Sequence, residues 1–291
     1  MVDKELQRKK AEEFLELHND PHILLLPNAW DVVTTKMYER FGFEAIGTTS
    51  AGIAATLGYP DGQQMTLEEN LSVVERIVKN TILPVSADIE SGYSITVEGA
   101  VKTAEAVLDI GAVGINLEDS TGNEENPFFE ISEVVERIKA IRSIAKTNGI
   151  HLVINLRTDV YMLGKASHAE NFKHTVERAN IYREAGADCI FVPDMGDFNE
   201  QIIAQLVKEI NAPLNIIAGG NIPPIQKLEE IGVARVSFGP RPMRAMLSFL
   251  CKMQKELLEK GTYDFMTTDT MSYDEVNTIL GNKKNLKKIL N

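Results

Sequence analysis

The chain alternates eight times between a short apolar run and a longer segment with helical periodicity. Each run is rich in Val, Ile, Leu and Ala and has no polar face, which is typical of a strand covered on both sides in a parallel sheet. Eight such units in about 240 residues match the number and length of a (β/α)8 or TIM barrel. The eight predicted strands are residues 23–26, 45–49, 85–89, 113–117, 151–156, 189–192, 214–218 and 235–238.

The segments between these runs carry charged residues on one face, and several end on a glycine. A glycine just past a helix is a common C-terminal signal, because it adopts the left-handed backbone conformation without strain. The chief alternative, a doubly wound open sheet, has about six strands and usually a glycine-rich turn after the first one. Here the first run leads into the sequence PNAWD instead. We therefore predict an α/β barrel, with helices at residues 67–80, 97–112, 133–149 and 175–187.

The chain is predicted to divide into two parts. Residues 1–240 form the barrel with an N-terminal helix, and residues 241–291 form a C-terminal helical extension. Residues 242–261 read as one long helix with a broader apolar face than a helix alone in water carries. We expect this helix to pack on a neighbouring subunit, with packing on its own barrel as the alternative. Its apolar residues are Met243, Met246, Leu247, Leu250, Met253, Leu257 and Leu258.

Composition argues against several classes of protein. The formal net charge is −12 and no long basic block interrupts the acidic balance, so nucleic-acid and anionic-membrane partners are not expected. The two cysteines, Cys189 and Cys251, are too few for a disulfide framework or a cysteine-rich zinc site. The N-terminus is charged and no run of 18 apolar residues occurs, which predicts a cytoplasmic protein. The five histidines lack metal-ligand spacing and are predicted to lie at the surface or at an interface.

Acidic residues follow several of the predicted strands. Asp61, Asp88, Glu90, Glu118 and Asp119 all stand where an apolar run ends. The carboxyl ends of barrel strands meet at one face, so these side chains are expected to converge there. Converging carboxylates repel one another unless a cation or a proton neutralises them, and oxygen ligands suit magnesium. The i, i+2 spacing of Asp88 and Glu90 on an extended segment would point both to the same side.

Several motifs, in order along most of the chain, resemble the phosphoenolpyruvate mutase/isocitrate lyase superfamily. They are PNAWD, TTSAGIAATLGYPDG, SADIESGY, NLEDS, the RTD of INLRTDVY, and GVARVSFGP. The resemblance implies a (β/α)8 barrel and a magnesium ion. It also implies an enolate or enolpyruvate intermediate, formed as a carbon–carbon or phosphorus–carbon bond beside a 2-oxo acid is broken or made. Helix-swapped dimers, commonly paired into tetramers, are a further implication.

The resemblance assigns a role to each acid. Asp88 matches the principal magnesium ligand, and Glu90 stands beside it where the family more often has aspartate. Asp61 and Glu118 match acids that surround the metal, acting through waters, and both are expected to serve catalysis. From the residues alone, an acid after a strand could equally be a helix cap, and Asp61 in YPDG could be only a turn former. Asp119 is expected behind the site or at a helix cap.

Further residues match the substrate-binding part of the family pattern. Backbone amides and a hydroxyl of a small-residue segment hold the substrate carboxylate or phosphoryl group, and Arg157 binds a carboxylate through its planar fork. The alternatives are an ordinary strand end for the small residues and a structural ion pair with Asp159 for the arginine. The expected substrate-binding residues are Thr48, Thr49, Ser50, Asn215 and Arg244.

One segment departs from the family pattern. The lyases carry a Lys/Arg-Cys-Gly-His type motif after the fourth strand, whose cysteine protonates the departing enolate, and the mutases use Lys and Asn there. The corresponding stretch here, STGNEENPFFEIS, has neither Cys nor Lys, which leaves Asn123 and Asn126 as partial substitutes, with Asn123 the expected catalytic residue. Pro193 stands where the mutase tends to have histidine. We expect residues 120–129 to form a mobile lid, with a fixed surface loop as the alternative.

The expected function is therefore that of a magnesium-dependent enzyme acting on a small 2-oxo or 2-hydroxy carboxylate. Carbon–carbon bond cleavage in an oxaloacetate-like dicarboxylate is the first candidate. A phosphonomutase or phosphonopyruvate-hydrolase type reaction, including one like that of carboxyvinyl-carboxyphosphonate phosphorylmutase, is the second. A barrel that binds a keto acid without turning it over is the third.

Overall fold

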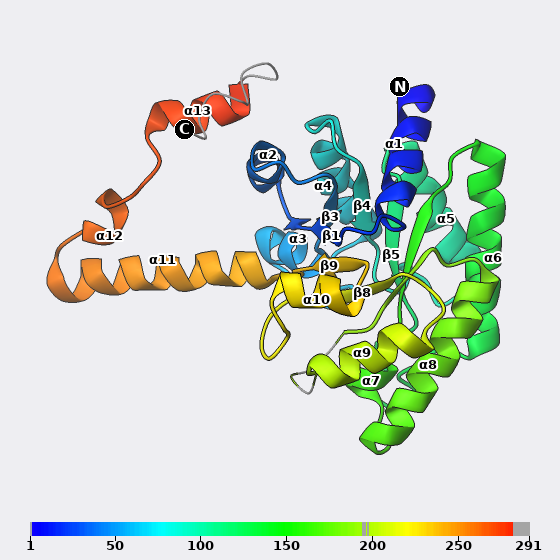
Figure 1. The fold of residues 1–291 in the computed structure, drawn as a ribbon. Helices are drawn as coiled ribbons and strands as arrows, with labels where there is room; N and C mark the ends of the chain where they lie inside the picture. Colours follow the sequence, from blue (N-terminus) through cyan, green and yellow to red (C-terminus); the bar gives the residue numbers. More distant parts are fainter. Residues whose placement is uncertain (1, 194–195, 197, 282–291) are drawn as a thin grey trace.

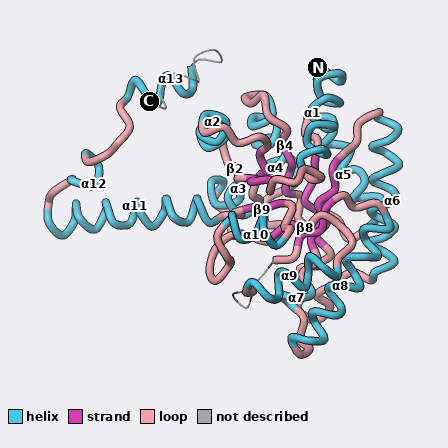
Figure 2. The backbone as a smooth tube through the Cα atoms, in the orientation of Figure 1, coloured by secondary structure: helices cyan, strands magenta, loops and turns pink. Residues whose placement is uncertain are grey.

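The structure is a computed structural model that describes residues 2–281 apart from residues 194, 195 and 197. Nine parallel strands form one sheet in the order β1-β9-β8-β7-β6-β5-β4-β3-β2. Helices surround this sheet, as Figure 2 shows, and the predicted (β/α)8 architecture is confirmed. The strands are β1 (Leu24–Leu26), β2 (Asn28–Ala29), β3 (Ile46–Thr48), β4 (Val85–Asp88), β5 (Gly114–Glu118), β6 (Val153–Arg157), β7 (Cys189–Phe191), β8 (Leu214–Ile217) and β9 (Arg235–Ser237).

The ninth strand, β2, was not predicted: it begins at Asn28, just after Pro27 and beyond the end of the first predicted strand at residue 26. Proline has no N–H to donate to a neighbouring strand, so the ladder is interrupted there. Before the break β1 pairs with β9, and after it β2 pairs with β3. The segment from β1 to β2 therefore connects β9, the last strand, to β3.

The predicted helices are present, with ends that differ by up to three residues, except that α8 begins at His168 and not at the predicted residue 175. Thr66 and Glu69 form a capping box at the start of α4, and Gly149 ends α6 in the left-handed conformation. The helices are α1 (Lys4–Leu17), α2 (Val32–Arg40), α3 (Ser50–Leu57), α4 (Leu67–Lys79), α5 (Val97–Asp109), α6 (Ile131–Asn148), α7 (Val160–Leu163), α8 (His168–Ala185), α9 (Glu200–Glu209), α10 (Ile225–Ile231), α11 (Arg241–Lys260), α12 (Asp264–Thr267) and α13 (Tyr273–Gly281).

Helix α1 packs at the amino-terminal end of the strands. The side chain of Gln7 donates to the carbonyls of Leu108 and Ala112, at 2.8 and 3.0 Å. Phe14 lies against Gly114, the first residue of β5, where a Cβ would come within 2.7 Å of the ring. The carboxyl ends of the strands are left for the site described below.

His18, at the end of α1, corrects the prediction that the histidines lie at the surface or an interface. It is 2% exposed. Its Nε2 contacts Nη1 of Arg235 at 3.3 Å, and because a guanidinium can only donate, Nε2 must accept. The proton therefore resides on Nδ1, which donates to the Phe14 carbonyl at 2.7 Å. Burial, together with the charge of Arg235, lowers the pKa of His18 to about 4.

This depressed pKa predicts a pH-dependent stability. In the unfolded chain His18 takes up a proton near its ordinary pKa of about 6.5, whereas the folded chain resists protonation down to about 4. The stabilisation is complete above pH 6.5 and is lost as the pH falls, by about 2 kcal/mol between pH 7 and pH 5. Urea unfolding at both pH values should show this loss relative to His18→Gln, which cannot titrate. An identical pH dependence in the two proteins would contradict the assignment.

The C-terminal arm consists of α11, α12 and α13. Helix α11 projects away from the barrel, as Figure 1 shows, while α13 contacts α2. Glu256 near the end of α11 accepts hydrogen bonds from the backbone N–H groups of Asp264 and Phe265, which fixes the start of α12. Many apolar side chains on the arm are exposed, among them Met246, Leu247, Phe249, Leu250, Leu258 and Phe265. Within the described residues, no helix combines the length and apolarity needed to cross a bilayer.

Candidate active site

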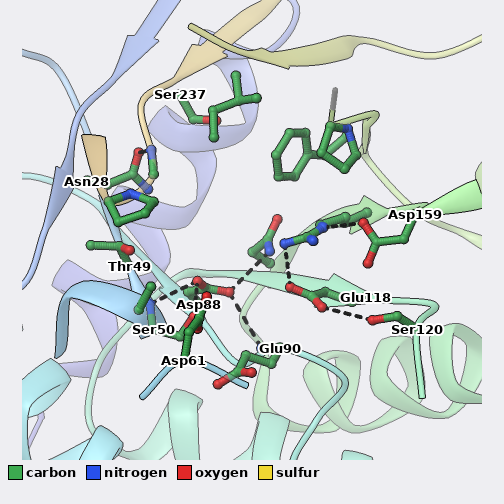
Figure 3. A pocket seen from close by; sticks show the side chains of 18 of the residues that line it. Asn28, Thr49, Ser50, Asp61, Asp88, Glu90, Glu118, Ser120, Asp159 and Ser237 are labelled. Carbon is green, nitrogen blue, oxygen red and sulfur yellow. Dashed lines mark hydrogen bonds and ion pairs between the residues drawn. The ribbon is translucent and has the colours of Figure 1, made fainter. Parts of the chain in front are cut away.

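A cavity of about 340 Å³ opens at the carboxyl ends of the strands. Its walls come from most of the strands and the segments that follow them, between Asn28 and Arg241, and Figure 3 labels some of these residues. The structure brings together at this cavity eight of the residues singled out in the sequence. They are Thr48, Thr49, Ser50, Asp61, Asp88, Glu90, Glu118 and Arg157.

Asp88, the last residue of β4, is held in place by neighbouring polar groups. Its Oδ2 accepts from the backbone N–H and the hydroxyl of Ser50, at 2.9 and 2.8 Å. Its Oδ1 accepts from the side-chain amide of Asn116 at 3.1 Å, and its own N–H donates to the Thr48 hydroxyl. Thr48 and Ser50, expected to hold substrate, therefore orient this carboxylate. Thr49 begins α3 as its N-cap.

Glu90 reaches the cavity by a different route from the one predicted. Its φ of 49° is left-handed, so the segment after Asp88 is not extended and the i, i+2 argument for its direction was wrong. The side chain is buried among other acids. Burial, followed by the negative charges of Asp88 and Asp61, raises the pKa of Glu90 to about 8. This carboxyl group would gain from a cation nearby.

Glu118, Arg157 and Asp159 form a buried chain of charges. Arg157 donates from Nη1 to Glu118 at 2.7 Å and from Nε to Asp159 at 2.6 Å. Burial raises the pKa of Glu118 while the charge of Arg157 opposes the rise, and the two carboxylates keep the guanidinium charged. The ion pair with Asp159 is present, and Arg157 also lines the cavity. The other carboxylate oxygen of Glu118 accepts a hydrogen bond from the Ser120 hydroxyl at 3.1 Å.

Asp119 lies behind the cavity and supports it. Its Oδ1 accepts from the backbone N–H of Asp159 at 2.9 Å. Its Oδ2 accepts from Arg178 and from the hydroxyl of Tyr182, at 3.1 and 3.2 Å. Asp119 therefore holds the backbone of Asp159, the residue that pairs with Arg157, from the side away from the cavity.

Three other expected site residues lie away from the cavity wall. Asn123 turns its Oδ1 to the backbone N–H of Glu125 at 2.8 Å, and the cavity is lined by its neighbour Gly122 instead. Asn215 is buried and donates to the hydroxyl of Ser237, which does line the cavity. Arg244 is exposed one helical turn beyond Arg241, the arginine of α11 that the cavity contains.

Asp61 lies at the cavity in an exposed turn. Its Oδ1 accepts from the N–H of Gly62 at 3.0 Å. Both expectations, a turn residue and an acid near the site, are therefore compatible with its position.

Several lining residues were missed in the sequence. Asn28 accepts at Oδ1 from the N–H groups of Phe238 and Gly239, both at 2.8 Å, and so ties the first strand to the last. Asn116 carries an amide inside an otherwise apolar run, and that interruption was the available signal. The others are Ser237, Arg241 and the apolar residues Met162, Leu163, Phe191 and Ile217, while Pro193, noted in the sequence, also lines the cavity.

The segment 120–129 folds as a hairpin beside the cavity. Ser120 bridges Phe128, and the N–H of Thr121 donates to the Pro127 carbonyl at 2.9 Å. Phe129 is buried at its base, and Lys165 donates to the Glu124 carbonyl near its tip. The two ends are thus tied together while the tip is exposed. Whether it opens and closes as a lid stays a prediction.

The donor set suits a lightly held magnesium ion. Across the described part of the chain, no group of three or more His, Cys, Asp or Glu residues is arranged to hold a metal. Magnesium keeps several waters and needs only one or two carboxylates. Asp88 and Glu90 supply two at the cavity, where burial and then the charges of Asp88 and Asp61 raise the pKa of Glu90. A two-carboxylate site therefore fits, and a closed cage of acids does not.

The chain is similar to several known proteins. The family model described as phosphoenolpyruvate phosphomutase matches residues 14–258. An uncharacterized protein of Mycobacterium tuberculosis is 36% identical over 234 residues, covering 80% of this chain and 84% of that protein. A 2-methylisocitrate lyase of Aeropyrum pernix is 29% identical over 271 residues, covering 89% and 84%.

Solved structures share the fold. A protein of Burkholderia cenocepacia J2315, provisionally assigned as a lyase/mutase, superposes with a TM-score of 0.89 at 31% identity, covering 96% of this chain and 98% of that one. A 2,3-dimethylmalate lyase superposes with a TM-score of 0.80 at 21% identity, covering 94% of each chain, and shows the fold alone. The chain belongs to the phosphoenolpyruvate phosphomutase family, within the PEP mutase/isocitrate lyase superfamily, whose members are lyases and phosphonomutases.

Proposed function

We propose that this enzyme is magnesium-dependent and breaks or forms a carbon–carbon bond beside a small 2-oxo or 2-hydroxy carboxylate of the oxaloacetate type, through an enolate. The observation that supports this most is the presence of Asp88, Glu90 and Arg157 at one cavity. Two carboxylates suit a metal, and a guanidinium suits the carboxylate of a substrate. The expected roles of Asp61 and Glu118, through waters around the metal, remain part of the proposal.

Some of the cavity residues would bind the metal or the substrate, and others hold those residues in position. Asp88 and Glu90 would hold the ion, which when bound supplies positive charge that stabilises an enolate oxygen. Ser50 and Asn116 keep Asp88 oriented by hydrogen bonds at 2.8 and 3.1 Å. Arg157 orients the substrate carboxylate. The apolar wall that includes Phe191 excludes water from the reacting atoms.

Phosphorus–carbon chemistry is the second candidate. The hairpin offers Asn123 and Asn126 but no Lys, and the cavity has Pro193 in its wall. Among the described lining residues the cations are Arg157, already paired with two carboxylates, and Arg241. A phosphoryl group carries more charge than a carboxylate and would draw on Arg241 in particular. A keto-acid-binding barrel without turnover is the third candidate, favoured by the absence of Cys and Lys from residues 120–129.

A panel of 2-oxo acids, 2-hydroxy acids and phosphonates separates these candidates. Each compound would be incubated with the enzyme in millimolar magnesium or in chelator, and products would be followed by proton and phosphorus NMR. Magnesium-dependent cleavage of a dicarboxylate is the expected result. Product from phosphonates alone would replace this proposal with the second candidate. Binding by calorimetry without product in any case would favour the third.

We also propose that the enzyme is a homodimer or homotetramer assembled through its C-terminal arm. Leu247 and Leu250 on α11 are 49% and 44% exposed, so this face is not covered by its own barrel. An apolar cavity of about 690 Å³ lies beside it, lined by α11 and by Trp30 and Ala55. Exposed apolar surface of this extent is typical of an interface between subunits.

Charged substitutions on α11 test the assembly. We expect Leu247→Glu/Leu250→Glu to convert a dimer or tetramer into a monomer, because two carboxylates cannot be buried in an apolar interface without a large cost. Light scattering at micromolar concentration measures this. Lys252→Glu, at an exposed polar position of the same helix, should leave the assembly intact. A monomeric wild-type chain would refute the proposal.

A further inference from the structure

Arg137 on α6 is a buried cation that forms no ion pair within the described residues. It is 1% exposed. Its Nη1 donates to the carbonyl of Ser91 at 2.8 Å, and its guanidinium carbon lies 4.0 Å from the centre of the Phe129 ring. Nε and Nη2 find no hydrogen-bond partner among the described residues. Burying a charge in this way is unfavourable, so the contacts that it does make deserve an explanation.

The first contact holds a strained turn. Glu90, Gly92 and Tyr93 all have positive φ, at 49°, 90° and 52°. Residues other than glycine rarely adopt this conformation, and it persists only where the surroundings impose it. Here the carbonyl of Ser91 is held by Arg137, and its hydroxyl accepts from Gln63 at 2.6 Å. The side chain that this turn delivers to the cavity is that of Glu90.

The second contact holds the base of the hairpin. Phe129 is the last residue of the segment 120–129 and donates its N–H to the Asp119 carbonyl at 3.0 Å. Its ring stacks on the guanidinium of Arg137, an arrangement in which a planar cation is attracted to the aromatic face. The other end of the hairpin carries Ser120 and Gly122, both at the cavity. One guanidinium therefore touches both the turn that presents Glu90 and the hairpin that borders the same cavity.

We propose that Arg137 is a positioning residue that couples the Glu90 turn to the hairpin. When the guanidinium is in place, the carbonyl of Ser91 and the ring of Phe129 are fixed relative to each other. Movement of the hairpin then changes the direction of the Glu90 side chain. Conversely, binding of a cation to Glu90 changes the position of the hairpin. The inference rests on the proposed function only where it concerns magnesium, because the mechanical coupling exists without a ligand.

Arg137→Met separates coupling from simple stability. Methionine fills much of the same volume and removes the buried charge, so the fold should remain as stable as in the wild type, with a melting temperature within about 3 °C. We expect faster amide hydrogen exchange in both residues 90–93 and residues 120–129, by roughly tenfold, with the rest of α6 unchanged. Magnesium affinity, measured by calorimetry, should fall by about tenfold. Lys139→Met, at an exposed position of the same helix, is the matched control.

Two further variants act on one contact each. Arg137→Lys keeps a donor for the Ser91 carbonyl but loses the planar stacking. Compared with Arg137→Met, amide hydrogen exchange should therefore slow down more at residues 90–93 than at residues 120–129. Phe129→Leu alters only the hairpin side, yet it should raise exchange at residues 90–93 as well. These two also provide the test if Arg137→Met does not fold.

The possible outcomes are distinct. Unchanged exchange at residues 90–93 in Phe129→Leu would overturn the coupling. Faster exchange throughout the protein in Arg137→Met would reduce Arg137 to a general structural residue. If the wild type binds no magnesium, the proposed function fails, and the exchange measurements still decide the role of Arg137.

Discussion

Asp88→Asn is expected to lower magnesium affinity by at least about 100-fold while the fold is retained. Asparagine keeps the shape of the side chain and an oxygen that can accept from Ser50, but it removes the negative charge that a hard cation requires. The loss should exceed the roughly 10- to 100-fold typical of residues that only support a ligand. Catalytic activity toward any accepted substrate should disappear with it.

Calorimetry measures the affinity, and thermal unfolding with and without millimolar magnesium gives an independent measure. An ion that binds only the folded chain raises its stability by RT ln(1 + [L]/Kd). The wild type should therefore become more stable when magnesium is added, and Asp88→Asn should not. Asp109→Asn, at an exposed position at the end of α5, serves as the control for the change in net charge. Wild-type affinity in Asp88→Asn would show that the metal site was assigned wrongly.

Arg157→Gln is expected to destabilise the fold by about 3–5 kcal/mol. The substitution leaves Glu118 and Asp159 close together and buried without the cation between them. Removing one partner of a buried ion pair costs far more than removing an exposed pair, because the remaining charge is desolvated and uncompensated. Urea unfolding at pH 7.5 measures the change.

A double substitution tests whether the uncompensated charges cause the destabilisation in Arg157→Gln. Arg157→Gln/Glu118→Gln removes one of the stranded charges, so it should recover part of the lost stability, and comparison with both single variants, Arg157→Gln and Glu118→Gln, gives the coupling energy between the two side chains. Lys102→Gln breaks an exposed pair with Glu98 at 2.6 Å and should produce no measurable change. Additive effects in the double variant would mean that the charges do not interact.

The sequence determined the barrel and the general location of the site. Apolar runs of strand length alternate with helical segments, and this local periodicity is sufficient to predict parallel strands and crossover helices. Because parallel strands share one carboxyl edge, residues that follow strands, such as Asp88, Glu118 and Arg157, necessarily gather around one opening. The family motifs then made the kind of chemistry predictable.

Where an argument depended on the conformation of single residues, the sequence was not sufficient. Glu90 enters the cavity through a left-handed turn, and no periodicity reports a positive φ at a glutamate. Helix α11 begins at Arg241, which places that arginine at the cavity and the predicted Arg244 on the exposed surface. The start of this helix was predicted to within one residue, but a helix boundary does not report which of its two arginines lines the cavity.

Contacts between distant segments were decided by the tertiary structure alone. His18 is buried, and Arg235, 217 residues later in the chain, contacts its ring from β9. In the sequence, Arg137 is one of several charged residues of a predicted helix. The packing of α6 nevertheless places it between Ser91 and Phe129. Hydrophobic patterns specify which face of an element is buried. They do not specify which polar group meets which other one inside, because that depends on how the elements are packed.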